Sequence, residues 1–325
     1  CGSFWAAGQG PGVNQARADA VGPVLALILA TLFWAGNYVV GAFAVRTMDP
    51  LELTYLRWVI AAVPLLAIAQ VVERPDWGTV WRRWPVHLGL SLSGMIAYTL
   101  LLYGALRHTS AIDASLINAA NPAVIVLCAL TLFRDRIGPR AVTGILLGLL
   151  GVLVVLTDGH LLAMLGLQIN RGNALMLAAI LVWSLYTLFG RYLTASPPIA
   201  STAVQAVLAV VVLTPMTLRS GVHWPQEHEA ALSLLFIGIF PSVGSYLLWN
   251  MALRRVPAGK AGVFLNLIAV FTVLISVAMG ASLSLAQLGG GALVFCGIAL
   301  VSSRPQPAAA RTRSTRPTTD PQDTV

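Results

Sequence analysis

The feature that most constrains this chain is a repeat. A tryptophan followed seven residues later by a glycine occurs within a long apolar stretch as Trp34 and Gly41, and again about 149 residues later as Trp183 and Gly190. Self-similarity at a fixed period indicates that one structural unit has been duplicated. The two units are therefore expected to share a fold and to pack against each other.

Hydropathy places both units in a membrane. The chain is 57% hydrophobic and only 10% charged, and its mean hydropathy is +0.80, which excludes a soluble domain of this length. Stretches long enough to cross about 30 Å of hydrocarbon recur along the chain. We expect ten transmembrane helices, at residues 22–45, 51–72, 86–106, 111–133, 139–157, 172–194, 198–218, 230–253, 258–279 and 284–303.

Loop charges indicate that the second unit enters the membrane upside down. Segment 106–113 has one arginine, whereas its counterpart 253–260 has three basic residues; the charged run 134–136 is replaced by the uncharged segment 280–284. Basic residues mark the cytoplasmic side, and fifteen of the twenty lie on the side of the two termini. We therefore predict an all-α membrane protein with ten transmembrane helices, arranged as two inverted five-helix repeats around a central cavity, with both termini cytoplasmic.

The predicted domains follow from this pattern. The first five-helix repeat covers residues 21–158 and the second, inverted one covers 170–303, while 1–20 and 304–325 are expected to be disordered cytoplasmic tails because they contain too little apolar surface to fold. A chain that begins at Cys1 is expected to be truncated at its start, with a lipid-modified cysteine as the alternative. The other two cysteines lie in apolar segments, so we expect no disulfide, metal or cofactor.

Several short motifs occur in a fixed order along the repeat. They are the Trp-Gly spacing, the helix ends Tyr103-Gly104-Ala105-Leu106 and Asn250-Met251-Ala252-Leu253, and the runs Asn121-Pro122 and Phe133-Arg134-Asp135-Arg136. In these motifs residues 22–303 resemble the EamA-type members of the drug/metabolite transporter superfamily, and among them the exporters of aromatic amino acids. The resemblance implies that helices 1, 3, 4, 6, 8 and 9 surround a cavity through which amino acids or other small metabolites are exported. This chain departs from the family where a proline and an acid are common near helix 9, since it has Ala269 and Ser282 there.

The first helix of each unit has a stripe of aromatic and polar residues near its middle. Spacings of three, four and seven residues place the members of a stripe on one helical face. Tryptophan and tyrosine usually lie at the membrane interfaces, so at mid-depth they predict a wet cavity; the alternative is helix packing at glycine. The stripes are Trp34, Asn37, Tyr38 and Gly41 in the first unit and Trp183, Tyr186 and Gly190 in the second.

The third and eighth helices have weak points at matching positions, Gly94 and 241–244. Matching interruptions point to a binding site because the freed backbone groups need a cavity or a ligand. Asparagines in the fourth and ninth helices add amides that either bind a ligand or join helices. These four helices supply the further candidate substrate-binding residues Tyr98, Tyr246, Trp249, Asn250, Asn118, Asn121 and Asn266.

Arg57 is the one arginine set well inside an apolar stretch, and its counterpart in the second repeat is near Gln205. A charge within the membrane is a functional hypothesis by default. A bidentate contact with a substrate carboxylate is one reading. The alternative is that Arg57 extends outward to the interface or ties helix ends together.

Other glycines are predicted to pack helices. Gly144, Gly148 and Gly151 in the fifth helix form a small-xxx-small face, which Gly290 and Gly297 mirror in the tenth. The chain has no phosphate-binding loop, which excludes a nucleotide-driven pump.

We expect an alternating-access transporter that exports small organic metabolites, above all amino acids with bulky or aromatic side chains. Its expected partners are the small-molecule substrate and the lipid bilayer of the bacterial inner membrane, and no nucleic acid is expected. The sequence is compatible with a homo-oligomer as well as with a monomer. The nearest alternative is an exporter of drugs or toxic amines bound by cation–π contacts. No enzyme is expected, although His108 and Asp113 fit the spacing by which acyltransferases activate a hydroxyl, which makes a membrane-bound acyltransferase the alternative of a different class.

Energy coupling is predicted from where the titratable residues lie. Proton-driven carriers usually keep a carboxylate or imidazole within the membrane. Here the acids and histidines lie in loops or at helix ends, with Glu52 and Asp113 as the nearest acids to the apolar layer. Facilitated transport without obligatory proton coupling is therefore expected.

Overall fold

The protein is helical wherever its structure is described. The structure is a computed structural model that describes residues 13–133, 139–160, 170–190, 193, 196–221, 223–253, 255–256 and 264–302. Every regular element in these ranges is a helix, in agreement with the predicted all-α class. Helices are favoured because apolar segments in a bilayer must satisfy their backbone hydrogen bonds internally.

The first repeat contains nine helical elements within the described ranges. They are α1 (Val13–Ala44), α2 (Pro50–Val72), α3 (Trp77–Arg82), α4 (Trp84–Leu90), the π-helical segment η1 (Ser91–Ala97), α5 (Tyr98–Leu106), α6 (Ala111–Asn118), α7 (Asn121–Phe133) and α8 (Pro139–Leu156). Helix α1 begins inside the segment 1–20 that was predicted as a tail. Its start is rich in alanine, the strongest helix former, which explains the extension.

The second repeat has a similar order of elements. They are α9 (Arg171–Gly190), α10 (Pro198–Ser220), α11 (His228–Ile239), the π-helical segment η4 (Phe240–Gly244), α12 (Ser245–Leu253), α14 (Leu267–Ala278) and α15 (Leu285–Ser302). The charged run 134–136, Arg254 and Lys260 lie outside the described residues.

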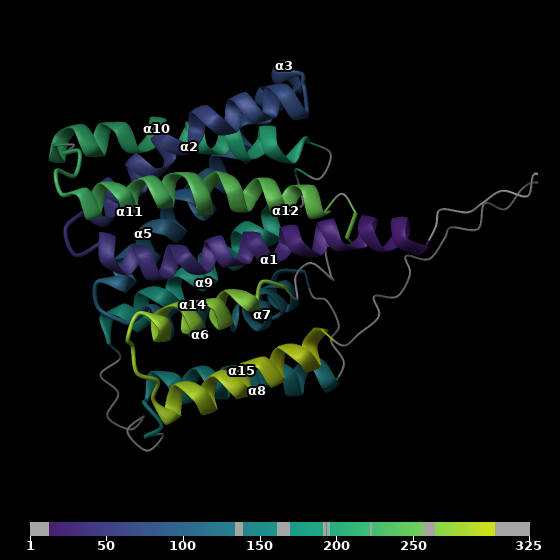
Figure 1. Ribbon diagram of the computed structural model, residues 1–325, viewed down its shortest axis with the longest axis vertical. Helices are drawn as coiled ribbons and strands as arrows, with labels where there is room; N and C mark the ends of the chain where they lie inside the picture. The colour runs from purple at the N-terminus through teal and green to yellow at the C-terminus, as the bar shows by residue number, and fades with distance from the viewer. Residues whose placement is uncertain are drawn as a thin grey trace, which may run out of the picture.

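The long helices lie side by side with nearly parallel axes (Figure 1). Helices α2 and α10 occupy one edge of the row, α1 lies near the middle, and α8 and α15 form the opposite edge. Loops gather at the two ends of the bundle. We call the end with residues 45–49, 107–110 and 279–284 the Arg107 end, and the end with residues 73–76 and 196–197 the Glu73 end.

Six helices in the described part of the chain are long and apolar enough to cross a membrane by length and composition. They are Gly22–Ala44, Pro50–Val72, Trp84–Leu106, Arg171–Gly190, Pro198–Ser220 and His228–Ala252. The other four predicted segments correspond to shorter apolar helices or, for 111–133, to α6 and α7 with a break between them. Pro122 explains the break, since it has no N–H to donate to the Asn118 carbonyl. The count of ten transmembrane helices stays a prediction.

Corresponding helices of the two repeats run in opposite directions. A Cβ atom on Gly41, near the end of α1, would lie 3.1 Å from the Tyr103 ring of α5. A Cβ on Gly172, in the first turn of α9, would lie 2.8 Å from the carbonyl oxygen of Ala105 in the same helix α5. The end of α1 and the start of α9 thus meet at one place, as the inverted repeat requires.

Two acids tie α2 to α10 at both ends of the bundle. The Glu73 carboxylate accepts hydrogen bonds from the N–H groups of Ile199 at 3.1 Å and Ala200 at 2.8 Å, at the start of α10. The Glu52 carboxylate accepts one from the His223 N–H at 2.5 Å, beyond the end of α10. Negative charge is favourable at a helix N-terminus, so Glu73 stabilises α10 directly.

At the Glu73 end, Asp76 caps the short helix α3. Its carboxylate accepts hydrogen bonds from the Thr79 hydroxyl at 2.6 Å and the Gly78 N–H at 3.0 Å. These bonds favour the charged form and lower the pKa of the Asp76 carboxyl below its ordinary value.

Helices α8 and α15 pack through their glycines, which confirms the predicted small-residue face. A Cβ on Gly151 would lie 2.5 Å from the Gly290 carbonyl oxygen, and one on Gly297 would lie 2.4 Å from the Gly144 carbonyl oxygen. The backbones therefore touch directly, and any side chain at these positions would separate the helices.

Candidate functional site

Both predicted weak points are π-helical turns. Gly94 lies within η1, and residues 241–244 lie within η4. A π-turn leaves backbone groups without regular helical partners, and such turns are frequent at functional sites. Tryptophan side chains satisfy one carbonyl in each: the Trp58 indole N–H donates to Met95 at 2.9 Å, and that of Trp34 donates to Pro241 at 3.2 Å.

A cavity of about 90 Å³ lies beside these turns, and we call it the central chamber. A single water molecule needs about 10–15 Å³, so the chamber has room for a small organic group. Most of the predicted site residues line it, together with residues that had not been singled out. The predicted residues that line it are Trp34, Asn37, Tyr38, Arg57, Tyr98, Asn118, Asn121, Trp183, Tyr246 and Asn266.

A second cavity of about 470 Å³, which we call the vestibule, adjoins the chamber towards the Glu73 end. Trp34, Trp183 and Tyr246 line both cavities and so lie between them. The other three predicted residues line the vestibule and not the chamber: Tyr186, Trp249 and Asn250. All thirteen candidates thus face one of two neighbouring cavities.

Aromatic rings from both repeats meet around the chamber. The ring centroids of Tyr98 and Trp183 are 4.8 Å apart, and those of Trp34 and Tyr246 are 5.7 Å apart. Tyr186 packs on Gly94, where a Cβ atom would lie 2.3 Å from the Tyr186 ring. Glycine is therefore required in η1 because only the absence of a side chain lets the second repeat approach so closely.

The asparagines lie where the fourth and ninth predicted helices are interrupted. Asn118 ends α6, Asn121 begins α7, and Asn266 directly precedes α14. The Asn121 amide accepts a hydrogen bond from the Ser184 hydroxyl at 3.0 Å and donates one to Asn118 at 3.3 Å, so it joins helices. The Asn266 amide lines the chamber and has no partner among the described residues. It is therefore free to bind a polar ligand.

Arg57 lies on the wall of the chamber and connects three helical elements. Its Nε–H and one Nη2–H donate to the Ser242 hydroxyl of η4 at 3.0 and 2.7 Å, and its Nη1–H donates to the Tyr103 hydroxyl at 2.5 Å. The Tyr103 hydroxyl in turn donates to Asn37 at 2.9 Å. The Arg57 side chain is only 4% exposed, so it does not extend outward to the interface.

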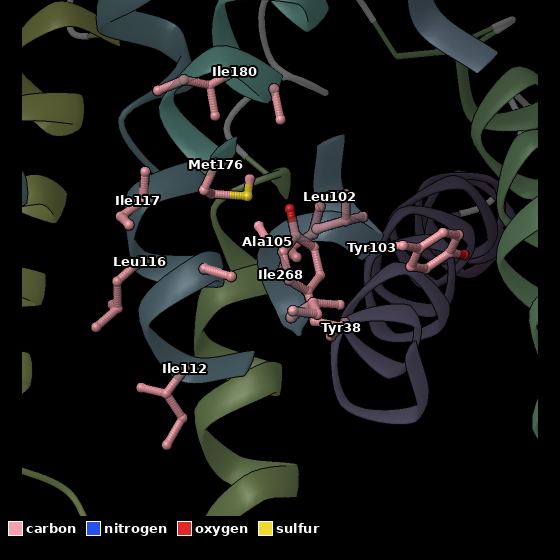
Figure 2. Close-up of a cluster of buried hydrophobic side chains, with 14 of the residues drawn as sticks. Tyr38, Leu102, Tyr103, Ala105, Ile112, Leu116, Ile117, Met176, Ile180 and Ile268 are labelled. Carbon is pink, nitrogen blue, oxygen red and sulfur yellow. The ribbon is translucent and has the colours of Figure 1, made fainter. Parts of the chain in front are cut away.

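The chamber is closed towards the Arg107 end by a buried apolar cluster (Figure 2). Tyr38 and Ile268 of this cluster line the chamber, while Leu106 and Ile112 line a groove of about 930 Å³ at the Arg107 end. The cluster therefore lies between the chamber and the groove. Leu102, Tyr103, Ala105, Ile117 and Met176, all in the cluster, are completely buried.

The pair considered for acyl transfer lies in that groove. No hydrogen bond between the side chains of His108 and Asp113 occurs in the described structure; the Asp113 carboxylate accepts hydrogen bonds from Gln287 at 2.7 Å and the Ser110 hydroxyl at 2.8 Å. Without contact to an acid, the imidazole is not oriented as a general base. Asp113 and Glu52 both hold helix ends, in keeping with their predicted positions.

Sequence reasoning did not single out two residues that contact Arg57 at the wall of the chamber. Trp58 lines the chamber next to Arg57, whose guanidinium carbon lies 4.9 Å from the Trp58 ring centroid. Ser242 lies inside the predicted weak point and bonds Arg57 from 185 residues away in sequence. The neighbouring charge could have signalled Trp58, but nothing local signals which partner Ser242 would find.

Two helical units that run in opposite directions, with interrupted helices around a chamber between them, form the architecture of a secondary transporter. The EamA-like transporter family matches residues 22–157 and again 170–303, once for each unit. The chain therefore belongs to the EamA-like transporter family, and it is a multi-pass membrane transporter. This confirms the resemblance found in the sequence and disfavours the enzyme alternative.

Named relatives agree with this class. The chain is 26% identical over 282 residues to the "Uncharacterized transporter YyaM" of Bacillus subtilis, covering 84% of this chain and 90% of the relative. It is 25% identical over 292 residues to the "Probable amino-acid metabolite efflux pump" of Salmonella typhimurium, covering 83% and 91%. A solved crystal structure, 23% identical, superposes with a TM-score of 0.63 over 86% of this chain and 96% of its own, which shows the shared fold.

Proposed function

We propose that this transporter exports amino acids with bulky or aromatic side chains and holds them in the central chamber. The observation that carries the proposal is the lining of the chamber, where aromatic rings from both repeats surround polar side chains, among them an Asn266 amide that has no partner in the described structure. Aromatic rings favour other flat apolar groups by stacking. The relative described as a probable amino-acid metabolite efflux pump supports the substrate class.

The proposed transport mechanism is alternating access of two inverted five-helix repeats, ten helices in all, in a bacterial inner membrane. With both termini in the cytoplasm, the Arg107 end faces outward and the Glu73 end inward. The apolar cluster then closes the outward path, and the vestibule connects the chamber with the cytoplasm. An amino acid would enter from the side on which it is made.

Site-specific reporters test this orientation. An accessibility reporter near Arg136 and one in the C-terminal tail should be cytoplasmic, whereas one near Ser282 should be external. Finding the first and third on the same side would contradict the inverted repeat.

The proposed energy source is the gradient of the solute itself. Among the described residues, the acids nearest the apolar layer hold helix ends and do not line the chamber. A carrier coupled to protons would need a titratable group at the site where its charge decides the open side.

Solute flux into lipid vesicles that contain only the purified protein tests the function. Labelled phenylalanine, tryptophan, alanine and an aromatic amine without a carboxylate form a suitable panel. We expect the two aromatic amino acids to equilibrate faster than alanine. Flux of the amine alone would favour the drug-exporter alternative, and no flux with an acyl-transfer activity lost in His108→Ala would favour the enzyme.

A further inference from the structure

A positive charge is buried beside the chamber without an acidic partner. Arg57 is 4% exposed and lines the chamber, and none of the chamber-lining residues in the described structure is aspartate or glutamate. Its contacts within the described residues are neutral hydroxyls and aromatic rings. Removing an ion from water is unfavourable unless an opposite charge compensates it. The electrostatics of the chamber therefore favour binding of an anion.

Arg57 retains hydrogen-bonding capacity to meet that demand. A guanidinium has five N–H groups, of which three donate to Ser242 and Tyr103. The two that remain are one on each terminal nitrogen. Two N–H groups on the terminal nitrogens of one planar guanidinium can bind both oxygens of a carboxylate.

We propose that Arg57 binds the carboxylate of the transported solute, so that the site selects solutes by their anionic group. The inference rests on the proposed function and specifies its substrate class as carboxylates, including zwitterionic amino acids. Organic cations without a carboxylate are rejected because they would add a second positive charge to a site that already holds one.

The remaining polar groups of the chamber are compatible with the rest of an amino acid. The Asn266 amide is without a partner in the described structure and offers an oxygen to an ammonium group. Trp183 and Tyr98 line the chamber, where aromatic rings can contact an ammonium or an aromatic side chain. Because these groups are neutral, they tolerate an ammonium but do not require one, and the carboxylate remains the selected feature.

A purely structural role for Arg57 makes a different prediction, since the residue also joins α2 to η4 and α5. Ser242→Ala removes the acceptor of two of its hydrogen bonds but leaves the charge in place. If Arg57 only holds helices together, Arg57→Gln and Ser242→Ala should weaken all ligands alike. If Arg57 binds the solute, only Arg57→Gln should change which ligands are preferred.

The experiment measures binding of four matched ligands to the full-length protein in detergent, by quenching of its tryptophan fluorescence. The ligands are phenylalanine, 3-phenylpropionate, phenylalaninamide and phenethylamine, of which only the first two have a carboxylate. We expect the wild-type protein to bind those two about tenfold more tightly than the others or better, as for charged hydrogen bonds. Arg57→Gln should reduce that preference to about twofold or less, while Arg57→Lys and Ser242→Ala should keep a clear preference for carboxylates.

The ligand comparison on the wild-type protein does not depend on a variant folding. Equal or tighter wild-type binding of phenylalaninamide and phenethylamine would overturn the assignment of Arg57 while leaving transport of aromatic solutes intact. Preference retained in a folded Arg57→Gln protein, checked by size-exclusion chromatography, would also overturn it. Binding of none of the four ligands would overturn this assignment and the aromatic substrate class together.

Discussion

Gly41 and Gly190 hold the same position in the two repeats but have opposite surroundings. A Cβ atom on Gly41 would lie 3.1 Å from Tyr103 and 3.3 Å from Leu106, whereas no atom of the described structure lies within 4 Å of one on Gly190. Gly41 packs at the closed Arg107 end, and Gly190 lines the vestibule towards the Glu73 end. The helices around Gly41 in the first repeat are therefore packed together, whereas those around the equivalent Gly190 in the second repeat leave a cavity.

Other equivalent residues of the two repeats also differ in this way, packed in the first repeat and loosely held in the second. Tyr103 is completely buried and holds Arg57, whereas its counterpart Asn250 lines the vestibule. The side-chain amide of Gln205, the counterpart of Arg57, accepts one long hydrogen bond of 3.4 Å from the Tyr186 hydroxyl in the described structure. Two related units can thus adopt two conformations, and exchange of these conformations between inverted repeats is what alternating access requires. We expect the Glu73 end to close by bringing Asn250 onto Gly190.

The largest effect on transport is expected at the open glycine. Gly190→Val should fold normally, because no atom of the described structure lies within 4 Å of a Cβ atom there. It should slow transport about tenfold or more because the added side chain obstructs closure; overpacking costs about 1–3 kcal/mol. Vesicle flux and thermal unfolding measure the two effects. Gly289→Val is the matched control, since no described atom lies within 4 Å of a Cβ there either. Wild-type flux in Gly190→Val would break the comparison.

The tryptophans of the two stripes should show a smaller effect. Trp34→Ala and Trp183→Ala should each raise the Kd for phenylalanine several-fold, because a lost stacking surface costs about 0.5–1.5 kcal/mol. Trp34→Ala should lower stability more than Trp183→Ala, since the Trp34 indole N–H also donates to the Pro241 carbonyl of η4. Titration and thermal unfolding separate the two effects. Wild-type affinity in both variants would make the stripes packing surfaces.

The hydroxyls of the two tyrosines sharpen the comparison further. Tyr103→Phe removes the hydrogen bonds to Arg57 and Asn37 and should lower the free energy of unfolding by about 1.5–3 kcal/mol. Tyr186→Phe removes one long bond to Gln205 and should cost about 0.5 kcal/mol or less. Chemical denaturation in detergent measures both changes. Equal losses would mean that the two ends are held equally tightly.

The smallest effect is expected at the acids. Asp113→Asn and Glu52→Gln should leave transport unchanged. In vesicles with an imposed pH gradient, the wild-type protein and both variants should equilibrate the substrate without accumulating it. Each acid bonds a loop or a side chain at a helix end, so a modest loss of stability is the only change expected. Uphill accumulation that either substitution abolishes would instead make that acid a proton carrier.

Local chemistry explains how much of the site could be read from the sequence. The weak points at Gly94 and at residues 241–244 depend on glycine and proline, which weaken a helix in any surroundings. Both lie in π-turns in the structure. The stripes likewise needed only helical periodicity to point to one face. The break between α6 and α7 was not predicted, although Pro122 is its local cause. Helix α1 begins earlier than expected because hydropathy marks only its apolar part and not the polar turns before it.

By itself the sequence determined the membrane environment, the duplication, the interrupted helices and the residue types around the chamber, because hydropathy, periodicity and helix-breaking are properties of neighbouring residues. Only the tertiary structure decided that Arg57 meets Ser242 and Tyr103, that Trp58 lines the chamber, and that the Arg107 end is the closed one. These features depend on contacts between segments 46 to 185 residues apart. Two repeats with the same pattern can pack in either of two ways, so the pattern cannot say which end is open.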